Sequence, residues 1–383
     1  MVEEITNRII NGSWHAHTDE TFFPGPGNNP HIPNDLAERA QEFIRCLHHR
    51  IENHIHRYSG RPPHYEDYFS CLWQIVQDET FEAPNPLLEN FISAFKAETV
   101  HLYEGQASHI GIVTETGLTQ NRFASLAERT SRLTQWAVYY SLNGAKSPVG
   151  LDLISEAARD FGSLDIFSLN HDLLLEKYLD GEDINYADGF SESDGDVQLF
   201  NSSWRDFGGP VCLFKLHGSI DWWRLRFKSR GVDQFAKVVG NPENAKDSTG
   251  ARLWSPDNIP KFLTGTTSKE QAYGSDLFVD VFAEFRQRLN TYRTLICSGY
   301  GWEDKGINIR IDQWLRNDRA NRVVILHGKE GESLEQKRFW AHRWDKGVEE
   351  GKVIHIPKWL CCCQLADIEK YLDAAADGLM EPR

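Results

Sequence analysis

The fold is decided by one stretch of the chain, Leu164-Asp165-Ile166-Phe167-Ser168-Leu169-Asn170-His171-Asp172-Leu173-Leu174-Leu175-Glu176. Residues 166–169 predict a short buried strand, and residues 173–179 predict the start of a helix. Three polar residues, Asn170, His171 and Asp172, lie where the strand gives way to the helix. Ligands bind outside the carboxyl ends of strands in an open parallel sheet, so these side chains are candidates for a site. The alternative is that Asn170 or Asp172 only caps the helix.

Four more apolar runs have the length and composition of buried strands. They are residues 211–216, 294–297, 323–326 and 353–356. The first is followed by His217-Gly218-Ser219, and the second by the loop Ser298-Gly299-Tyr300-Gly301-Trp302. Helical patterns lie between the runs, and such an alternation predicts a parallel α/β sheet covered on both faces. Two segments, 181–210 and 222–270, are expected to be irregular.

The first part of the chain has a different pattern. Residues 21–24 predict a short strand that enters a glycine loop, Gly25-Pro26-Gly27-Asn28-Asn29. A loop of this kind before a helix lets backbone N–H groups approach a phosphate, although a plain turn is the alternative. Residues 35–161 are predicted to be almost entirely helical, with a large insertion over 64–161. Its aromatic stripes are typical of a core, yet they exceed what one thin helical layer should bury, which suggests protein contacts.

Composition excludes several classes of protein. The 383 residues carry a net charge of −15, so we expect no direct grip on a nucleic-acid backbone. The sequence has no apolar run long enough to cross a membrane and begins without a signal peptide, which predicts a cytoplasmic protein without membrane contact. Seven cysteines include the run Cys361-Cys362-Cys363. Because neighbouring side chains on a strand point to opposite faces, we expect free thiols there and no metal site.

Four motifs together resemble the sirtuin (SIR2-like) domain, which is marked by Gly-Ala-Gly-X-Ser, Thr-X-Asn-X-Asp, His-Gly and a later Gly-Ser/Thr loop. Here they are, in order, Gly25-Pro26-Gly27-Asn28-Asn29, Ser168-Leu169-Asn170-His171-Asp172, Leu216-His217-Gly218-Ser219 and Ser298-Gly299-Tyr300-Gly301. Pro26 stands in place of the usual alanine, and Asn29 in place of the usual serine. Sirtuin deacylases carry a four-cysteine zinc module after the His-Gly motif. No cysteine lies between Cys212 and Cys297, so that module is not expected.

The resemblance implies a Rossmann-like parallel sheet with a helical insertion and no zinc. Within a domain spanning residues 1–383, it assigns 35–161 to the helical region, 162–360 to the rest of the core and 361–383 to a helical tail. Without the zinc module, the chain is similar to bacterial anti-phage SIR2 proteins, which hydrolyse NAD+. The implied catalytic residues are Asn170 and His217. The residues implied to bind NAD+, as substrate, are Gly25, Gly27, Asn29, Asp172, Ser298 and Gly299.

A chain of this size also resembles the SIR2 subunit that assembles with a HerA-like hexameric ATPase, which implies a homo-oligomer and such a partner. The competing expectation is a binding module that holds NAD+ or a related nucleotide without turnover. Asn170 and His217 favour the enzyme because a pure binder needs neither. Pro26 and Asn29 favour the binder because they alter the phosphate loop.

Overall fold

The computed structural model describes residues 1–17, 21–25, 35–80, 85–104, 122–145, 148–206, 208–228, 230–238, 244–265, 268–328, 334, 337, 339–341 and 343–372. The chain divides into two compact units. The first contains Met1–Gly144, Trp223–Asp233 and Leu253–Ser268. The second contains Ala145–Trp222, Gln234–Arg252 and Lys269–Arg383, and so holds both the Asn170 and His217 motifs.

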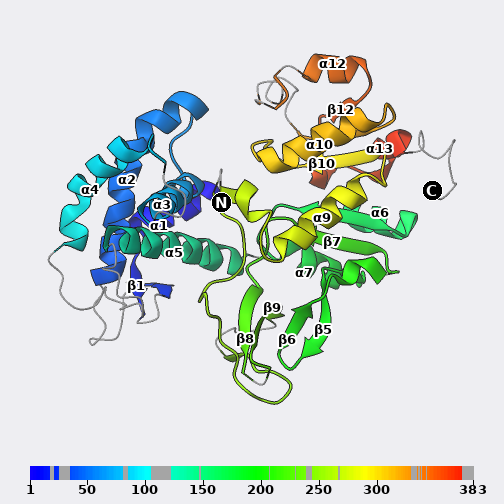
Figure 1. The fold of residues 1–383 in the computed structure, drawn as a ribbon. Helices are drawn as coiled ribbons and strands as arrows, with labels where there is room; N and C mark the ends of the chain where they lie inside the picture. Colours follow the sequence, from blue (N-terminus) through cyan, green and yellow to red (C-terminus); the bar gives the residue numbers. More distant parts are fainter. Residues whose placement is uncertain are drawn as a thin grey trace. The chain divides into compact units, whose positions relative to one another are not determined.

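The first unit is mainly helical (Figure 1). Its elements are α1 (Val2–Asn11), β1 (Trp14–Ala16), β2 (Phe22–Pro24), α2 (Asp35–Ser59), α3 (Tyr65–Glu79), α4 (Glu89–Tyr103), α5 (Arg122–Asn143) and most of β8 (Trp222–Phe227). Phe43 of α2 lies 4.9 Å from Phe95 of α4 and 5.6 Å from Phe123 of α5, measured between ring centroids. All three side chains are buried, so they form part of the core of this unit.

The strand before the glycine loop does not join the parallel sheets. β2 pairs antiparallel with β1, with Ala16 opposite Phe22 and Trp14 opposite Pro24. Among the described residues these two strands form a separate two-stranded sheet. Phe22 and Trp14 are buried in the first unit, and this burial explains why the short strands pair with each other.

The second unit confirms the parallel α/β class. Its parallel strands are β3 (Leu164–Ser168), β4 (Tyr186–Ala187), β7 (Val211–Lys215), β10 (Thr294–Ser298), β11 (Arg322–Leu326) and β12 (Val353–Ile356). They form two three-stranded sheets, ordered β3-β7-β4 and β10-β11-β12. The helices around them are α6 (Asp152–Phe161), α7 (Leu174–Gly181), α8 (Ser268–Ala272), α9 (Phe278–Leu289), α10 (Lys305–Asn317), α12 (Trp344–Glu349) and α13 (Leu365–Leu372).

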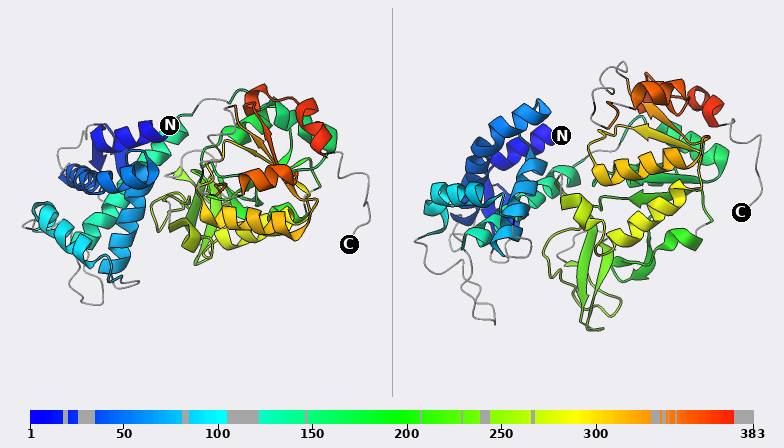
Figure 2. Two further views of the ribbon diagram at one scale, coloured as in Figure 1. Left: turned by 90° about the horizontal axis from the view of Figure 1, so that it is seen from above. Right: turned by 45° about the horizontal axis from the view of Figure 1, so that its top comes forward.

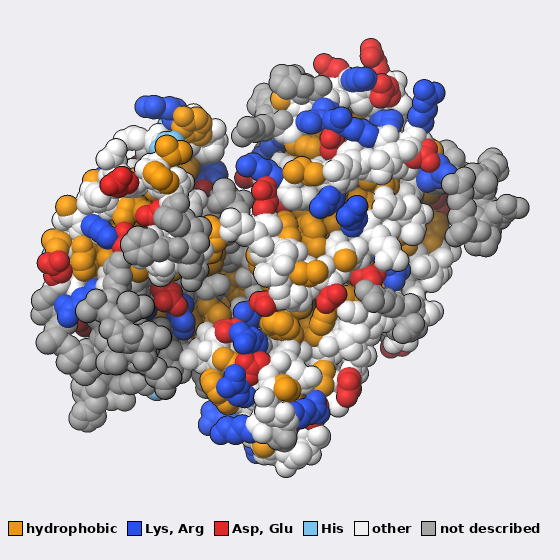
Figure 3. Space-filling view, viewed as in Figure 1, with side chains coloured by type: hydrophobic (Ala, Val, Ile, Leu, Met, Phe, Trp, Pro, Cys, Tyr) orange, Lys and Arg blue, Asp and Glu red, His pale blue; other side chains and the backbone are white. Residues whose placement is uncertain are grey.

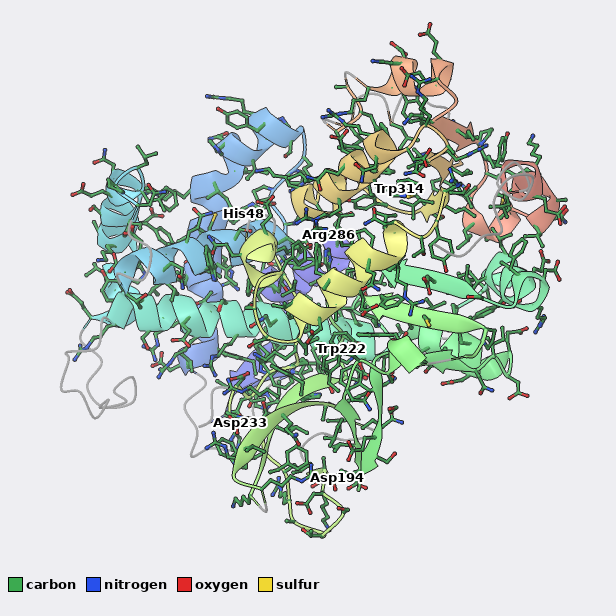
Figure 4. All side chains as sticks on the ribbon, turned by 45° about the vertical axis from the view of Figure 1, so that its right-hand side comes forward. His48, Asp194, Trp222, Asp233, Arg286 and Trp314 are labelled. Carbon is green, nitrogen blue, oxygen red and sulfur yellow. The ribbon has the colours of Figure 1, made fainter. Side chains whose placement is uncertain are left out.

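Side-chain contacts fix the helices on these sheets. Phe285 of α9 packs edge-on against Phe167 of β3 at 4.9 Å, and Arg288 of α9 pairs with Asp165 of β3 at 3.3 Å. Trp314, labelled in Figure 4, lies on α10. Its indole is buried and donates to the carbonyl of Tyr292 at 3.1 Å. α9 and α10 therefore each combine buried apolar side chains with a polar contact to a neighbouring segment.

The segment 181–210 is not the loop that we expected. It contains β5 (Phe190–Asp194), β6 (Val197–Phe200) and η1 (Ser203–Asp206), and β6 pairs antiparallel with both β5 and β9 (Val232–Val238). Gly195 lies between β5 and β6 with a φ of +67°, and a Cβ there would lie 2.3 Å from the carbonyl oxygen of Lys246. β6 is short and buries the alternate residues Val197 and Leu199, while β5 buries only Phe190 and Asp194 at its two ends. Such partial burial weakens the signal of these strands in the sequence.

The last helix of the predicted helical region belongs to the second unit. Leu153 and Ala157 of α6 form one apolar cluster with Val324 of β11, Ile356 of β12 and Ile368 of α13. Figure 2 shows α6 and α13 beside each other in this unit. The apolar face of α6 therefore covers strand residues, and the C-terminal helix is part of the same core.

The three consecutive cysteines do not lie on a strand. Leu360–Cys362 form a 3-10 turn, η3, in which Cys361 and Cys362 are exposed with their Sγ atoms 3.6 Å apart. Cys363 is buried in the α6–α13 cluster. Our expectation that neighbouring thiols point to opposite faces is wrong for Cys361 and Cys362, because the turn replaces the strand geometry. All seven cysteines are free thiols.

The surface drawn in Figure 3 mixes charges of both signs over α10 and α12. Asp312 of α10, for example, pairs with Arg316 at 2.9 Å and with Arg343 at 3.2 Å. Basic side chains there are thus partly neutralised by acidic neighbours. No described helix is both long enough and apolar enough to cross a membrane.

Replacing Ile368 with alanine should destabilise the second unit. Ile368 is 1% exposed in the α6–α13 cluster, so truncation leaves a cavity and lowers the free energy of unfolding by about 3 kcal/mol. Urea unfolding followed by circular dichroism measures the change. Glu369→Ala, at the exposed neighbouring position, is the matched control and should change stability by less than about 0.5 kcal/mol. Equal stability of the two variants would contradict the packing of α13.

Candidate functional site

The site begins with the register of two parallel strands. Ser168 of β3 lies opposite Lys215 of β7, and the Leu216 N–H donates to the Ser168 carbonyl at 2.9 Å. Asn170 and His217 each follow two residues after this pair, so both emerge at the carboxyl edge of the same sheet. The Ile220 N–H also donates to the His171 carbonyl at 3.0 Å, which joins the two loops beyond the strands. Strand pairing thus brings together two of the motifs found in the sequence.

His217 is buried among polar partners, with only 4% of its surface exposed. Its Nε2 atom lies 2.8 Å from the Tyr273 hydroxyl and 2.9 Å from Oδ2 of Asp304. The Tyr273 hydroxyl donates to the same Asp304 oxygen. Burial and the charge of Asp304 raise the pKa of Tyr273 far above its usual value, so this hydroxyl stays protonated.

Asp304 connects His217 to the loop after β10. It is the N-cap of α10, and its Oδ1 accepts a hydrogen bond from the Ile307 N–H at 3.0 Å. Burial acts to raise the pKa of Asp304. The hydrogen bond and the charge of His217 lower this pKa, as do the hydrogen bonds from Tyr273 and from the Ile307 N–H, and together they bring it to about 2. The aspartate is therefore ionised at neutral pH.

Ser298 and Gly299 lie in this same loop. Ser298 is exposed at the end of β10, and Gly299 has a φ of +68° with no atom within 4 Å of where a Cβ would be. A glycine in this conformation with open space beside it allows close approach of a ligand to the backbone. The Tyr300 hydroxyl donates to Oδ1 of Asn308 at 2.8 Å, which ties the loop to α10.

A buried ion pair supports the turn that contains Asn170. Lys215 is 2% exposed, and its ammonium group donates to the Asp172 carbonyl and to Oε1 of Glu176, the latter at 2.8 Å. Oδ1 of Asp172 accepts from the Leu174 N–H at 3.0 Å. The N-cap of α7 is Leu173, however, so the alternative that Asn170 or Asp172 is the cap of this helix is wrong. The side chain of Asn170 is exposed at the sheet edge.

His171 differs from its neighbours in the motif. Its ring centroid lies 6.1 Å from that of His217, and the residue is buried. Burial, together with the charges of His217, Lys269 and Lys215, lowers the pKa of His171 well below its usual value. His171 is therefore a neutral residue of the interior.

The remaining predicted residues belong to the glycine loop. Gly25 ends β2 in the first unit, with a φ of +99° and no atom within 4 Å of its Cβ position. Gly27 and Asn29 lie outside the described residues. The structure thus brings together Asn170, Asp172 and His217, and joins them through Asp304 to the loop of Ser298. The participation of Gly25, Gly27 and Asn29 stays a prediction.

Sequence reasoning missed three residues of this site. Asp304 could have been recognised in the sequence as a helix N-cap, because it is an aspartate three residues before the predicted helical residue Ile307. Lys215 also carries one, since a charged residue inside a buried strand requires a partner. Tyr273 directly follows the short helix α8, just beyond the segment 222–270, and nothing in the sequence links it to His217.

Residues 165–344 match the family model described as a SIR2-like domain. The match covers slightly less than half of the chain and supports the SIR2-like superfamily for that part. It begins within β3 and includes Asn170, Asp172, His217, Ser298 and Gly299. No curated protein matches the chain. The described residues contain no group of three or more His, Cys, Asp or Glu side chains that could hold a metal.

Replacing Lys215 with methionine should destabilise the second unit by about 3 kcal/mol, because it leaves the buried Glu176 without its cation. Burial already raises the pKa of the Glu176 carboxyl against the charge of Lys215. The double variant Lys215→Met/Glu176→Leu should recover part of the loss, since neither charge remains. Urea unfolding of the three proteins tests this, and a single variant as stable as the wild type would show that the pair contributes nothing.

Proposed function

We propose that the chain is an NAD+ hydrolase that cleaves the bond between nicotinamide and ribose. The observation that carries this proposal is the position of Asn170 and His217, two residues beyond a registered strand pair, within residues that match a SIR2-like domain. The family relationship supports NAD-related chemistry. Hydrolysis is our proposal for what that chemistry is in this chain.

The chemistry suits these two side chains. Cleavage develops oxocarbenium character at the ribose, and water then completes the hydrolysis. Nicotinamide leaves as a neutral molecule, so no strong acid is needed at the leaving group. The exposed amide of Asn170 can both donate and accept, which suits a group that orients the water and the ribose hydroxyls. Histidine titrates near neutral pH, which suits His217 as the general base.

Other residues fit the substrate as the resemblance implies. We assign the nicotinamide carboxamide to Asp172, whose Oδ2 has no hydrogen-bond partner among the described residues. We assign the rest of NAD+ to Ser298 and Gly299, where the backbone is open, and to Gly25, Gly27 and Asn29. These assignments treat NAD+ as a substrate and require no zinc.

We further propose that the enzyme acts in the cytoplasm in anti-phage defence by depleting NAD+. An unrestrained NAD+ hydrolase would kill its own cell, so control by other proteins is a necessary part of the proposal. We propose that the chain forms a homo-oligomer and that a HerA-like hexameric ATPase binds it and activates it. We assign this control to the helical insertion over residues 64–161, because packed helices have few alternative arrangements.

A binding module without turnover is the second candidate. It is favoured by one structural observation, which is that Nε2 of His217 is already held by Tyr273 and Asp304 inside the protein. The substitutions at Pro26 and Asn29 in the glycine loop point the same way. Such a module would bind NAD+ or a related nucleotide and serve assembly or sensing.

Asn170→Ala should lower the rate of nicotinamide release from NAD+ at least 100-fold, and His217→Ala should do the same. The assay uses purified protein, alone and with its ATPase partner, and follows nicotinamide by chromatography. Asn170 is exposed, so its variant should fold normally, whereas His217 is buried and its variant needs a parallel stability measurement. Asn290→Ala, at an exposed asparagine before β10, is the matched control. Binding of NAD+ without any release would favour the binding module.

The model of control predicts that the chain alone is an oligomer with weak activity. Light scattering after size exclusion should show a mass of several chains, and addition of the ATPase should raise both the mass and the rate of nicotinamide release. The catalytically inactive Asn170→Ala variant should assemble in the same way. A monomer with full activity in the absence of the partner would refute this control and leave the NAD+ chemistry intact.

A further inference from the structure

We infer that Asp304 is a positioning residue for His217, which it holds in one orientation and one tautomer while it stabilises the protonated ring. Tyr273 completes this buried group of three. The inference deepens the proposed function and rests on it for its catalytic meaning. The tautomer of His217, however, is a property of the protein alone.

The hydrogen bonds determine where the protons lie. An ionised carboxylate can only accept, and the Tyr273 hydroxyl gives its proton to Oδ2 of Asp304. Both atoms that face Nε2 of His217, at 2.8 and 2.9 Å, are then acceptors. Nε2 must carry a proton, so the neutral ring is the Nε2–H tautomer. Any proton that His217 takes up during the reaction goes to Nδ1, and the resulting imidazolium faces a carboxylate.

Asp304 is rigid enough to act in this way because its two oxygens have separate roles. Oδ1 caps α10 through the Ile307 N–H, and Oδ2 faces His217. Gly306 makes room for the third member, since a Cβ there would lie 2.5 Å from the ring of Tyr273. The start of α10 and the orientation of His217 are therefore set by one side chain.

Other charged or titratable groups surround the three residues. His171 lies beside His217, and the charges of Lys215 and Lys269 act on His171. Tyr300 lies near Asp304. Burial raises the pKa of Tyr300, and the negative charge of Asp304 raises it further. Asp304 places a negative charge 2.9 Å from Nε2 of His217, so removal of that charge should make protonation of the ring less favourable.

Asp304→Asn separates this role from the structural one. Asparagine caps helices about as well as aspartate, so α10 should still form. Its amide, however, brings a donor or an uncharged acceptor to Nε2 in place of the carboxylate. A residue that served only as a cap would leave the properties of His217 unchanged in this variant. Asp304→Ser, which keeps a cap and cannot reach His217, is the companion variant.

The experiment is a pH titration of protein labelled with 15N at histidine, followed by NMR, with nicotinamide release measured on the same samples. The wild type should show His217 as the Nε2–H tautomer. In Asp304→Asn the midpoint of its titration should fall by about one pH unit or more, and kcat should fall at least 100-fold with KM changed only a few-fold. An unchanged tautomer and midpoint would overturn the inference.

Two further results keep the test decisive. If Asp304→Asn does not fold, the variant Tyr273→Phe takes its place in the experiment. Because Asp304 remains in this variant, His217 should still be the Nε2–H tautomer. Loss of that tautomer would overturn the inference. If the wild type releases no nicotinamide even with its partner, the proposed function fails, while the NMR titration still decides the role of Asp304.

Discussion

The parallel pairing of β3 with β7 is the constraint on which the second unit depends. Because Ser168 lies opposite Lys215, the residues that follow each strand leave the sheet at the same level. A shift of one residue would turn every side chain of the strand to the other face. The register therefore places Asn170 and His217 together, and it also places Lys215 where its ammonium group supports the Asp172 carbonyl.

Buried charged side chains are a second feature of the carboxyl edge of the β3-β7-β4 sheet. Lys215 with Glu176, and His217 with Asp304, are ionisable pairs removed from water, which is costly unless each group has partners of good geometry. Here the partners come from different elements, namely β7, α7 and the start of α10. Each pair thus joins a helix to the strand β7 or to the residue that follows it closely.

The helices α1 to α5 present a different physical problem. Their aromatic residues, such as Phe43, Phe95 and Phe123, are buried against one another, so this unit has its own core. The match to a SIR2-like domain begins after them, at residue 165. The proposed NAD+ chemistry therefore rests on residues of the second unit. The proposals for assembly and control concern the part of the chain before residue 165, which the family match does not cover.

The sequence alone determined the parallel α/β class and the positions of Asn170, Asp172 and His217, because apolar runs that end in polar residues are local signals. It could not reveal the β5-β6-β9 strands, whose short runs are only partly buried, or the 3-10 turn at Cys361. Tertiary structure decided the partners of His217. Tyr273 and Asp304 lie 56 and 87 residues away from it in the sequence. No periodicity or motif connects these residues, and only the tertiary fold brings the residue after α8 and the N-cap of α10 into contact with His217.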